Sequence, residues 1–320
     1  PEVVLVWLLI ICAPLAARWR QNFGALLVVG ASALDLVPWS QHLLPHGEPE
    51  LFYPANPLIG TLTRETEGGA WRSIGLYKLI YPSLLPVYGL AELRPNNVLA
   101  PSDQLDVLRL AFGFNPTALN YYAAVANVDH PLLSFLNVRA VVGHIYLPQP
   151  RTLVPILEPR TLPFLVFRNV HALPRWFVPA AVDLIEPEDL PRWIAELDNA
   201  GRVAVFREQM EGFTLPPAAG VVSTARLLVG TSGHVELEVP GRGSRLLATS
   251  LPLPAGWQAA GGGRKLSTVT VNGAFLGALC PDGVSRITLD FLPPGIETGV
   301  VLFALALGVL STLYWKATGH

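Results

Sequence analysis

The chain has 320 residues, of which 51% are hydrophobic and 14% are charged, and its mean hydropathy is +0.41; because soluble globular proteins carry about 25% charged residues, this composition argues against an ordinary cytosolic enzyme. Twenty-two basic and 24 acidic residues give a formal net charge of −2 without a basic run, so the charge pattern of a nucleic-acid-binding protein is missing. Thirty prolines and 28 glycines argue against a mostly helical polytopic protein and favour a few apolar spans joined to a large, turn-rich globular part.

Two apolar stretches near the start of the chain predict a transmembrane hairpin. Residues 3–17 and 23–39 are apolar and flank a polar turn that contains Arg18 and Arg20. A signal peptide is not expected, because its positive charges would come before the apolar region rather than after it. Since the first residue is Pro1 and not Met, we expect the chain to be a fragment of a polytopic protein whose earlier spans are absent.

Residues 298–315 contain no charged residue and predict a membrane-spanning helix near the end of the chain. Tyr314, Trp315 and then Lys316 follow the aromatic-then-basic order of a membrane interface. A buried core helix is the alternative, but the terminal position and the absence of a polar face disfavour it. If the basic turn of the hairpin and Lys316 both lie in the cytoplasm, residues 41–294 form one extracytoplasmic insert of a multi-pass protein in the plasma (inner) membrane.

Residues 41–215 mix helical and extended patterns between proline-rich connections, which predicts a mixed α/β domain. The clearest helix is expected over residues 186–201, where acidic residues crowd the start and Gly201 ends the pattern. Residues 120–137 predict two short helical pieces broken at Pro131. Strands are expected over residues 138–147, 164–168, 175–181 and 203–206.

Residues 216–294 change to short strands with turn residues between them, which predicts a β-sandwich. Val235, Leu237 and Val239 alternate with polar residues, as expected of a strand with one buried and one wet face. The strands are expected over residues 221–229, 234–239, 244–251, 267–271, 274–280 and 285–291.

The expected architecture is a membrane-anchored α+β protein. Its transmembrane hairpin occupies residues 1–40, and its last transmembrane helix with a short cytoplasmic tail occupies residues 295–320. Cys12 in the hairpin and Cys280 in the insert are not expected to form a disulfide, because they belong to different parts of the chain. An exported domain without disulfides is consistent with a bacterial protein.

Several short motifs follow one another in a fixed order along almost the whole chain. They include Trp71-Arg72-Ser73, Phe167-Arg168-Asn169, Pro254-Ala255-Gly256-Trp257 and Asn272-Gly273-Ala274-Phe275. Others lie at residues 33–36, 52–54, 56–58, 88–90, 133–139, 172–175 and 281–283. Together they resemble the carboxy-terminal half of the bacterial YfhO-like membrane proteins, a group related to the C-type (GT-C) polytopic glycosyltransferases. The chain departs from the family pattern at Gly261-Gly262-Gly263, where the family tends to have an Asp-Gly turn.

The resemblance implies a protein that moves a sugar from a polyprenyl-phosphate carrier to a cell-envelope acceptor, such as an envelope glycopolymer or a lipid. It also implies that the catalytic acidic residue lies in an early extracytoplasmic loop upstream of this chain, which then supplies the extracytoplasmic module and the last membrane anchors. No cofactor is evident in the chain, and the resemblance allows a divalent metal in the full-length protein. A second function stays open, a non-catalytic envelope protein that binds glycans or partner proteins, so the sequence does not decide whether the chain belongs to an enzyme.

Four residues are candidates for binding the substrate. Asp35 is the only acidic residue within the apolar stretches of the hairpin, and a carboxylate inside the membrane is a functional candidate. Arg72 and Arg175 each lie beside a tryptophan and are candidates for contacting a phosphate or a sugar through charge and stacking, while Trp257 is a candidate carbohydrate platform. The alternative for all four is structural: a helix cap or a hydrated group for Asp35, and packing or pairing within the fold for the others.

No metal site is predicted. His42 and His46 are four residues apart and are followed by Glu48 and Glu50, but the intervening prolines and glycine break the helix that such a site needs, so a wet loop is expected. The other histidines are scattered without ligand spacing. The sequence also lacks the nucleophile elbow, the phosphate-binding loop, the dinucleotide fingerprint and the Cys-x-x-Cys motif.

Overall fold

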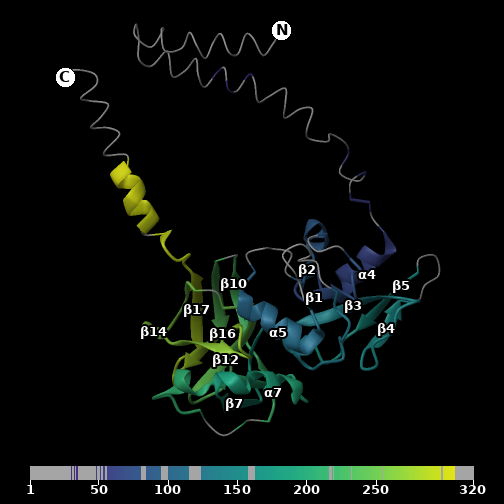
Figure 1. The fold of residues 1–320 in the computed structure, drawn as a ribbon. Helices are drawn as coiled ribbons and strands as arrows, with labels where there is room; N and C mark the ends of the chain where they lie inside the picture. Colours follow the sequence, from purple (N-terminus) through teal and green to yellow (C-terminus); the bar gives the residue numbers. More distant parts are fainter. Residues whose placement is uncertain are drawn as a thin grey trace. The chain divides into compact units, whose positions relative to one another are not determined.

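The computed structural model describes residues 30, 32, 34, 48, 51, 53–54, 56–80, 84–94, 100–114, 124–157, 163–215, 218, 220–231, 233–253, 255–296 and 298–306. The chain divides into two compact units, Pro1–Ala55 and Asn56–His320. Only isolated residues of the first unit are described, so the observed fold is that of the second unit. Its described residues form three β-sheets with few helices (Figure 1).

The first sheet, called the mixed sheet, has five strands in the order β2-β1-β3-β5-β4. These strands are β1 (Arg72–Gly75), β2 (Ala91–Glu92), β3 (Val138–His144), β4 (Val154–Leu157) and β5 (Phe164–Arg168). Strand β1 runs parallel to β2 and β3, whereas β3, β5 and β4 pair in an antiparallel way. Helix α4 (Pro57–Glu65) covers one face, because its fully buried Leu62 packs in a cluster with Val142 and Val166.

The second sheet, called the central sheet, has seven strands in the order β7-β8-β15-β16-β12-β6-β9. These are β6 (Trp176–Val178), β7 (Ala181–Ile185), β8 (Arg202–Phe206), β9 (Ser223–Thr224), β12 (Arg245–Pro252), β15 (Thr268–Val271) and β16 (Phe275–Cys280). Strands β7 and β8 are parallel and are joined through η2 (Pro187–Asp189) and α7 (Leu190–Ala195). The two strands and the helix between them form a β-α-β connection.

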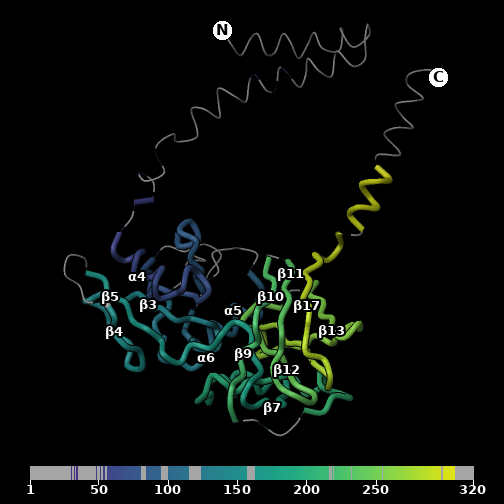
Figure 2. The backbone as a smooth tube through the Cα atoms, turned by 180° about the vertical axis from the view of Figure 1, so that it is seen from behind, coloured from purple at the N-terminus to yellow at the C-terminus, as the bar shows by residue number. Residues whose placement is uncertain are grey.

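The third sheet, called the outer sheet, has five strands in the order β10-β11-β17-β13-β14. These are β10 (Arg226–Gly230), β11 (His234–Glu238), β13 (Trp257–Gly261), β14 (Arg264–Leu266) and β17 (Arg286–Phe291), and Figure 2 shows four of them side by side. Buried side chains of the outer sheet, such as Leu237 and Leu289, pack with Leu247 and Leu276 of the central sheet. The two sheets therefore form a β-sandwich, as predicted.

The opposite face of the central sheet is covered by helices and by the mixed sheet. Further helices among the described residues of the second unit, besides the helical residues 298–306, are η1 (Leu85–Tyr88), α5 (Ser102–Phe112), α6 (Leu132–Phe135) and η3 (Arg207–Met210). Phe135 of α6 lies edge-on to Phe275 of β16 and to Phe177 of β6, with ring centroids 5.2 and 5.9 Å apart. Trp193 and Ile194 of α7 join the same cluster. Because both faces are packed, β16 has no exposed residue, which explains its unbroken apolar sequence.

The structure confirms most predicted strands and shortens the predicted helix. Strands β3, β5, β8, β11, β12, β15, β16 and β17 lie within the expected ranges or within one residue of them. The helix expected over residues 186–201 ends at Ala195, since the chain needs the next residues to turn back into β8. The strand expected over residues 175–181 is two strands, β6 and β7, and Pro179 lies between them.

The predicted division at residue 215 does not coincide with an edge of a sheet. Strands from both sides of it, β6 to β8 and β9 to β16, belong to the central sheet. Residue 215 follows η3 and precedes a proline-rich connection to β9, a composition that resembles a domain linker although the chain stays within one core.

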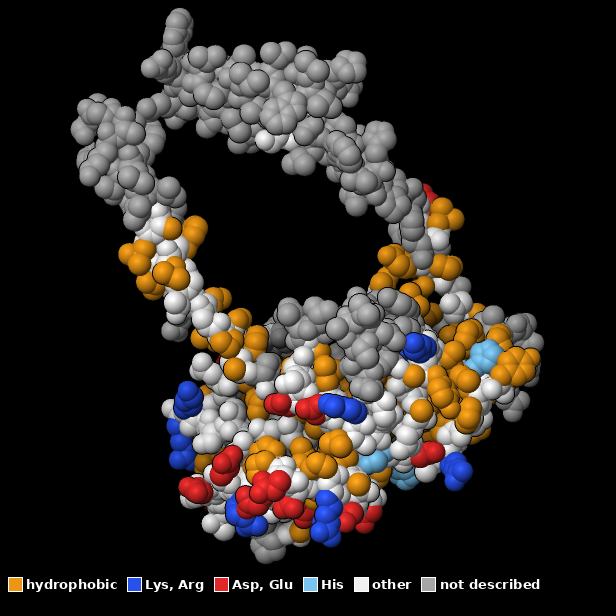
Figure 3. All heavy atoms as spheres, in the orientation of Figure 1, with side chains coloured by type: hydrophobic (Ala, Val, Ile, Leu, Met, Phe, Trp, Pro, Cys, Tyr) orange, Lys and Arg blue, Asp and Glu red, His pale blue; other side chains and the backbone are white. Residues whose placement is uncertain are grey.

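Among the described residues, no helix has both the length and the apolar character that a bilayer crossing requires. The predicted spans at residues 3–17 and 23–39 lie outside the described residues apart from Gly30, Ser32 and Leu34. Of the predicted span at residues 298–315, residues 298–306 are described and are helical. Apolar side chains of this helix are exposed (Figure 3), and they include Val300, Leu302 and Phe303. Membrane anchoring stays a prediction.

Two of the family-like motifs are turns in which a left-handed residue lies against a neighbouring strand or helix. Asn272 and Gly273 join β15 to β16 with positive φ angles of 49° and 78°. The fully buried Asn272 accepts a hydrogen bond at Oδ1 from the Ala204 N–H (2.8 Å), and its own N–H donates to the Ala204 carbonyl (2.9 Å). This turn therefore fixes β8 against β15 where their ladder ends.

Gly256 in the Pro-Ala-Gly-Trp motif has a φ of 117°, a conformation that is nearly restricted to glycine. A Cβ atom at this position would overlap the carbonyl oxygen of Leu292, whose N–H donates to the Gly256 carbonyl (3.0 Å). The motif therefore needs glycine both for its backbone angle and for the close approach of the chain that follows β17.

We expect Gly256→Ala to destabilise the protein by about 3 kcal/mol, because it adds steric overlap with main-chain atoms to the cost of a left-handed residue. Gly263→Ala is the matched control: Gly263 also has a positive φ, 74°, but its Cβ would meet nothing within 4 Å, so about 1 kcal/mol is expected. Urea unfolding of the detergent-solubilised chain, followed by tryptophan fluorescence, measures both. Equal losses in the two variants would contradict the close contact at Leu292.

Candidate functional site

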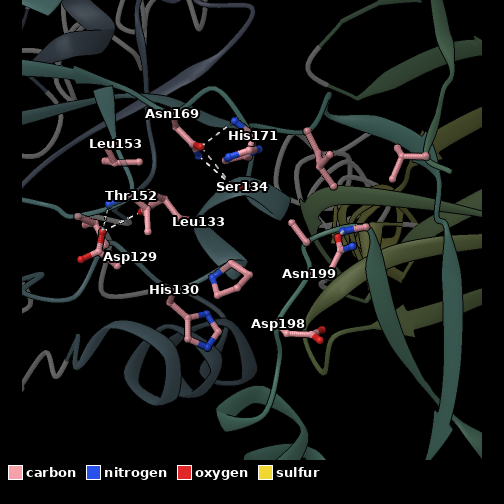
Figure 4. A pocket seen from close by; sticks show the side chains of 16 residues that line it. Asp129, His130, Leu133, Ser134, Thr152, Leu153, Asn169, His171, Asp198 and Asn199 are labelled. Carbon is pink, nitrogen blue, oxygen red and sulfur yellow. Dashed lines mark hydrogen bonds between the residues drawn. The ribbon is translucent and has the colours of Figure 1, made fainter. Parts of the chain in front are cut away.

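A cavity of about 450 Å³ lies beside α6, and residues from five parts of the chain line it (Figure 4). Figure 4 shows Asp129, Thr152 and Leu153 on one side of the cavity and Asp198 and Asn199 on the other. The remaining polar lining residues are His130, Ser134, Asn169 and His171. We call this cavity the α6 pocket. A second cavity, of about 460 Å³, shares Val128, Asp129 and Thr152 with it.

Asp129 is the acceptor that is most firmly held in the α6 pocket. Its Oδ1 accepts hydrogen bonds from the N–H groups of Arg151 (2.9 Å) and Thr152 (3.0 Å) and from the Thr152 hydroxyl (2.8 Å). Its Oδ2 has no protein partner in the part of the chain that the structure describes. The carboxylate is therefore fixed through one oxygen and leaves the other oxygen for a ligand.

His130 is held by both ring nitrogens. Its Nδ1 accepts from the Leu132 N–H (3.1 Å), so Nε2 carries the proton and donates to the Ile194 carbonyl (2.9 Å). Burial lowers the pKa of His130, and the ring lies edge-on to Phe112 at 6.0 Å. The imidazole therefore stays neutral and ties the start of α6 to α7, and it has no free nitrogen with which to act as a general base.

Ser134 and Asn169 form a buried pair at the back of the pocket. The Asn169 Nδ2 donates to Ser134 Oγ (3.0 Å) and to the Val138 carbonyl (2.9 Å), and its Oδ1 accepts from the His171 N–H (3.1 Å). A second amide follows the same plan, because Asn137 donates from Nδ2 to the Leu173 carbonyl (2.9 Å). These bonds attach the connection between β5 and β6 to the turn between α6 and β3, and they explain why amides occur in both motifs.

The opposite side of the pocket carries more exposed polar groups. Asn199 Oδ1 accepts from the Gly201 N–H (2.8 Å), which leaves its Nδ2 to donate. Asp198 is exposed and lies 3.9 Å from the Arg202 guanidinium. The His171 ring is also exposed, and neither of its nitrogens has a hydrogen-bond partner among the described residues. The pocket therefore combines rigid acceptors with groups that remain free to bind.

The structure brings two of the four predicted site residues together. Arg72, at the start of β1, donates to both oxygens of Ser250, and the Arg175 carbonyl accepts from the Ser250 N–H (3.1 Å). Trp257 lies in the outer sheet, half-buried and paired across strands with Phe291, with ring centroids 5.3 Å apart. This contact agrees with the structural alternative for Trp257, in which the ring packs within the fold. Asp35 lies outside the described residues, as do His42, His46 and Glu50.

No group of three or more histidine, cysteine, aspartate or glutamate side chains suited to a metal ion occurs among the described residues. Cys280 is buried in the sandwich, and burial raises the pKa of its thiol to about 12. A thiol that does not ionise near neutral pH is a poor nucleophile. The α6 pocket offers the polar groups of Asp129, His171 and Asn199 for hydrogen bonding to a ligand.

Sequence reasoning missed the α6 pocket. Asp129 and His130 stand in a loop before a proline, where a polar pair carries no distinctive spacing, and their partners Thr152 and Ile194 are far along the chain. Asn169 was within a motif of the family resemblance, and this was the signal that pointed to the region.

Comparison with known proteins supports the family resemblance over one segment. Residues 223–303 match the model of the family described as "Bacterial membrane protein YfhO". The match begins at β9, includes the whole outer sheet with β12, β15 and β16, and ends in the helix at residues 298–306. The resemblance that the motifs indicated is confirmed for this segment.

Two solved structures of the arabinofuranosyltransferase AftD from Mycobacteria, one of them a mutant, are also similar to the chain. Each match has 30% sequence identity and a TM-score of 0.22. It covers 24% of this chain and only 6% of AftD. A search of curated proteins gave no match.

We expect Asn169→Ala to destabilise the protein by about 2 kcal/mol, because it leaves Ser134 and the Val138 carbonyl without a buried donor. His171→Ala, two residues away and exposed, is the control and should change the stability by less than about 0.5 kcal/mol. Urea unfolding of the solubilised chain tests this, and equal stability of the two variants would show that Asn169 does not hold the pocket wall.

Proposed function

We propose that the chain is the extracytoplasmic module, with the last membrane anchors, of a YfhO-like membrane protein that acts in transferring a sugar from a polyprenyl-phosphate carrier to a cell-envelope acceptor. Within it, the α6 pocket binds the saccharide acceptor. The match of residues 223–303 to a bacterial membrane protein family supports the membrane context. The observation that carries the binding role is the fixed carboxylate of Asp129, which lines the cavity and has one oxygen without a partner among the described residues.

The lining of the α6 pocket suits a saccharide. The cavity of about 450 Å³ lies within the range of roughly 300–1,000 Å³ that small-molecule sites occupy. Asp129 Oδ2 accepts hydrogen bonds from sugar hydroxyls, and Asn199 Nδ2 donates to them. Leu133, Leu153 and Leu173 supply apolar surface for the C–H faces of the rings. A saccharide needs this combination of directional polar contacts and apolar contact.

The polar groups of the α6 pocket already form hydrogen bonds within the fold, and this favours binding over catalysis at the pocket. His130 uses both nitrogens within the fold, and Asp129 is held by three donors, so neither is poised to remove a proton. In the proposed protein the catalytic carboxylate lies in a loop upstream of this chain, and Asp35 is a candidate for binding the substrate. Any divalent metal of the full-length protein belongs to that part.

A non-catalytic function, in which the module binds envelope glycans or partner proteins without assisting a transfer, is the second candidate. The hydrogen bonds that Asp129 and His130 form within the fold also favour this second function. The two candidates share the saccharide-binding pocket and differ in whether loss of binding changes the envelope glycan, so a comparison of glycan composition in cells separates them.

We expect Asp129→Asn to weaken saccharide binding about tenfold, because a charge-assisted hydrogen bond is replaced while the amide oxygen can still accept the three donors that Oδ1 accepts now. Oligosaccharides released from the bacterial envelope are the probe, and saturation-transfer NMR with the detergent-solubilised chain is the measurement. Glu188→Gln, an exposed carboxylate outside the pocket, is the matched control and should bind like the unmodified chain.

The Asn199→Ala variant should also bind less tightly, since it removes the donor on the opposite side of the pocket. Binding that is the same in the Asp129 variant, the Asn199 variant and the control would rule out the α6 pocket as the saccharide site.

A further inference from the structure

Two arginines that have no acidic partner among the described residues meet at one residue of the central sheet. Arg72 Nη1 donates to the Ser250 carbonyl (2.9 Å), to the Ser250 hydroxyl (3.1 Å) and to the Leu136 carbonyl (3.0 Å). Arg175 lies on the other side of the same residue, since its carbonyl accepts from the Ser250 N–H (3.1 Å). Ser250 is fully buried in β12, and it holds the Arg72 guanidinium and the main chain of Arg175.

The two guanidinium groups have unused donors. Arg175 makes no side-chain hydrogen bond or ion pair with any described residue, and its Nε is buried without a partner. Arg72 uses only Nη1, so its Nε and Nη2 have no hydrogen bond within the described part of the chain. A guanidinium has five N–H donors, and buried donors are almost always paired in folded proteins.

Two other arginines of this fold have their guanidinium groups paired with carboxylates. Arg168 forms a two-bond ion pair with Glu65, with both distances 2.7 Å, and Arg139 pairs with Glu67 at 2.7 Å. Arg139 also lies over the Trp71 ring, 5.0 Å from its centroid. The fold therefore supplies carboxylates to the arginines beside the pair and leaves Arg72 and Arg175 without one.

This arrangement is electrostatically unfavourable, and it lowers the pKa of both arginines. Burial and, to a smaller extent, the positive charge of Arg175 together lower the pKa of Arg72 to about 9. Burial also lowers the pKa of Arg175. Two like charges in a partly desolvated environment repel each other. An anion between them offsets this repulsion and accepts hydrogen bonds from their unpaired N–H groups.

We propose that Arg72 and Arg175 bind one phosphate group of a ligand. Neither residue is fully buried, so part of each remains at the surface. A phosphate offers several oxygens to two guanidinium forks, and a monoester carries enough negative charge to balance two arginines, which a single carboxylate does not. The site is separate from the α6 pocket, since neither arginine lines that cavity.

The phosphate can belong to a lipid carrier or to a soluble compound, and the chemistry of the site is the same for both. This inference goes beyond the proposed function, because it needs only the arginine pair and not the saccharide pocket. Failure of saccharide binding in the Asp129 variant leaves it intact, and failure of phosphate binding leaves the saccharide pocket intact.

The test compares Arg175→Gln with Arg168→Gln in the full chain in detergent, with inorganic phosphate as the probe. Calorimetric titration should show phosphate binding to the unmodified chain, a loss of about tenfold or more in affinity in Arg175→Gln, and no loss in Arg168→Gln. Arg175 is chosen because its side chain has no structural partner in the described fold, so its replacement should not unfold the protein.

Thermal unfolding gives a second readout that a merely structural role would not produce. Without phosphate, Arg175→Gln should raise the Tm because it removes the repulsion, whereas Arg168→Gln should lower it because Glu65 loses its partner. Phosphate should raise the Tm of the unmodified chain and of Arg168→Gln, but not of Arg175→Gln. Equal phosphate affinity in Arg175→Gln and the unmodified chain, or no binding to the unmodified chain, would overturn the proposal.

The source of the phosphate is tested with phosphatidylcholine vesicles that contain or lack a polyprenyl phosphate. The chain is held in nanodiscs for this assay, so that its own predicted anchors do not insert into the vesicles. A lipid-linked phosphate predicts that the unmodified chain floats only with the vesicles that contain the polyprenyl phosphate. Capture that inorganic phosphate displaces and that Arg175→Gln loses supports a lipid-linked phosphate. Binding of inorganic phosphate without vesicle capture supports a soluble phosphate compound at the same site.

Discussion

Strand β16 lies between β12 and β15 and exposes none of its residues, because the outer sheet packs on one face of the central sheet and α6 and α7 pack on the other. The positions of the α6 pocket and of the arginine pair follow from this burial of both faces of the central sheet. Phe135 can hold α6 beside the α6 pocket because β16 and β6 present Phe275 and Phe177 to it. Ser250 can hold the Arg72 side chain and the Arg175 main chain because β12 is paired with both β16 and β6. The central sheet is thus the scaffold for both the pocket and the arginine pair.

The motifs that resemble the YfhO-like family occupy positions with a definite physical role in this scaffold. Asn272 completes the hydrogen bonding of β8 where the strand ladder stops, and Asn169 and Asn137 attach one connection to another through their side-chain amides. Gly256 allows the chain after β17 to approach β13. Each of these motifs is a junction between distant segments, where a buried amide or a glycine is difficult to replace.

The sequence predicted the local structure well and the meeting of distant segments poorly. Strands such as β5 and β16 were predictable because their apolar runs end at turn residues. Helix α4 was missed although Asn56 caps it and Pro57 opens it, since its apolar spacing is short. Arg72 and Arg175 were chosen separately, each for a neighbouring tryptophan; that they meet follows from the pairing of β6 with β12, which no spacing reveals. Asp129 was not found because its donors come from residues 151 and 152.

The most direct test of this account is hydrogen exchange of the solubilised chain, followed by mass spectrometry of peptides from β6, β8, β12 and β16. If the central sheet unites the segments on both sides of residue 215, the amides of these four strands should be the most protected and should exchange together through one opening event. Exchange of β6 and β8 that is far faster than, and independent of, the exchange of β12 and β16 would show two separately folding parts and would contradict the account.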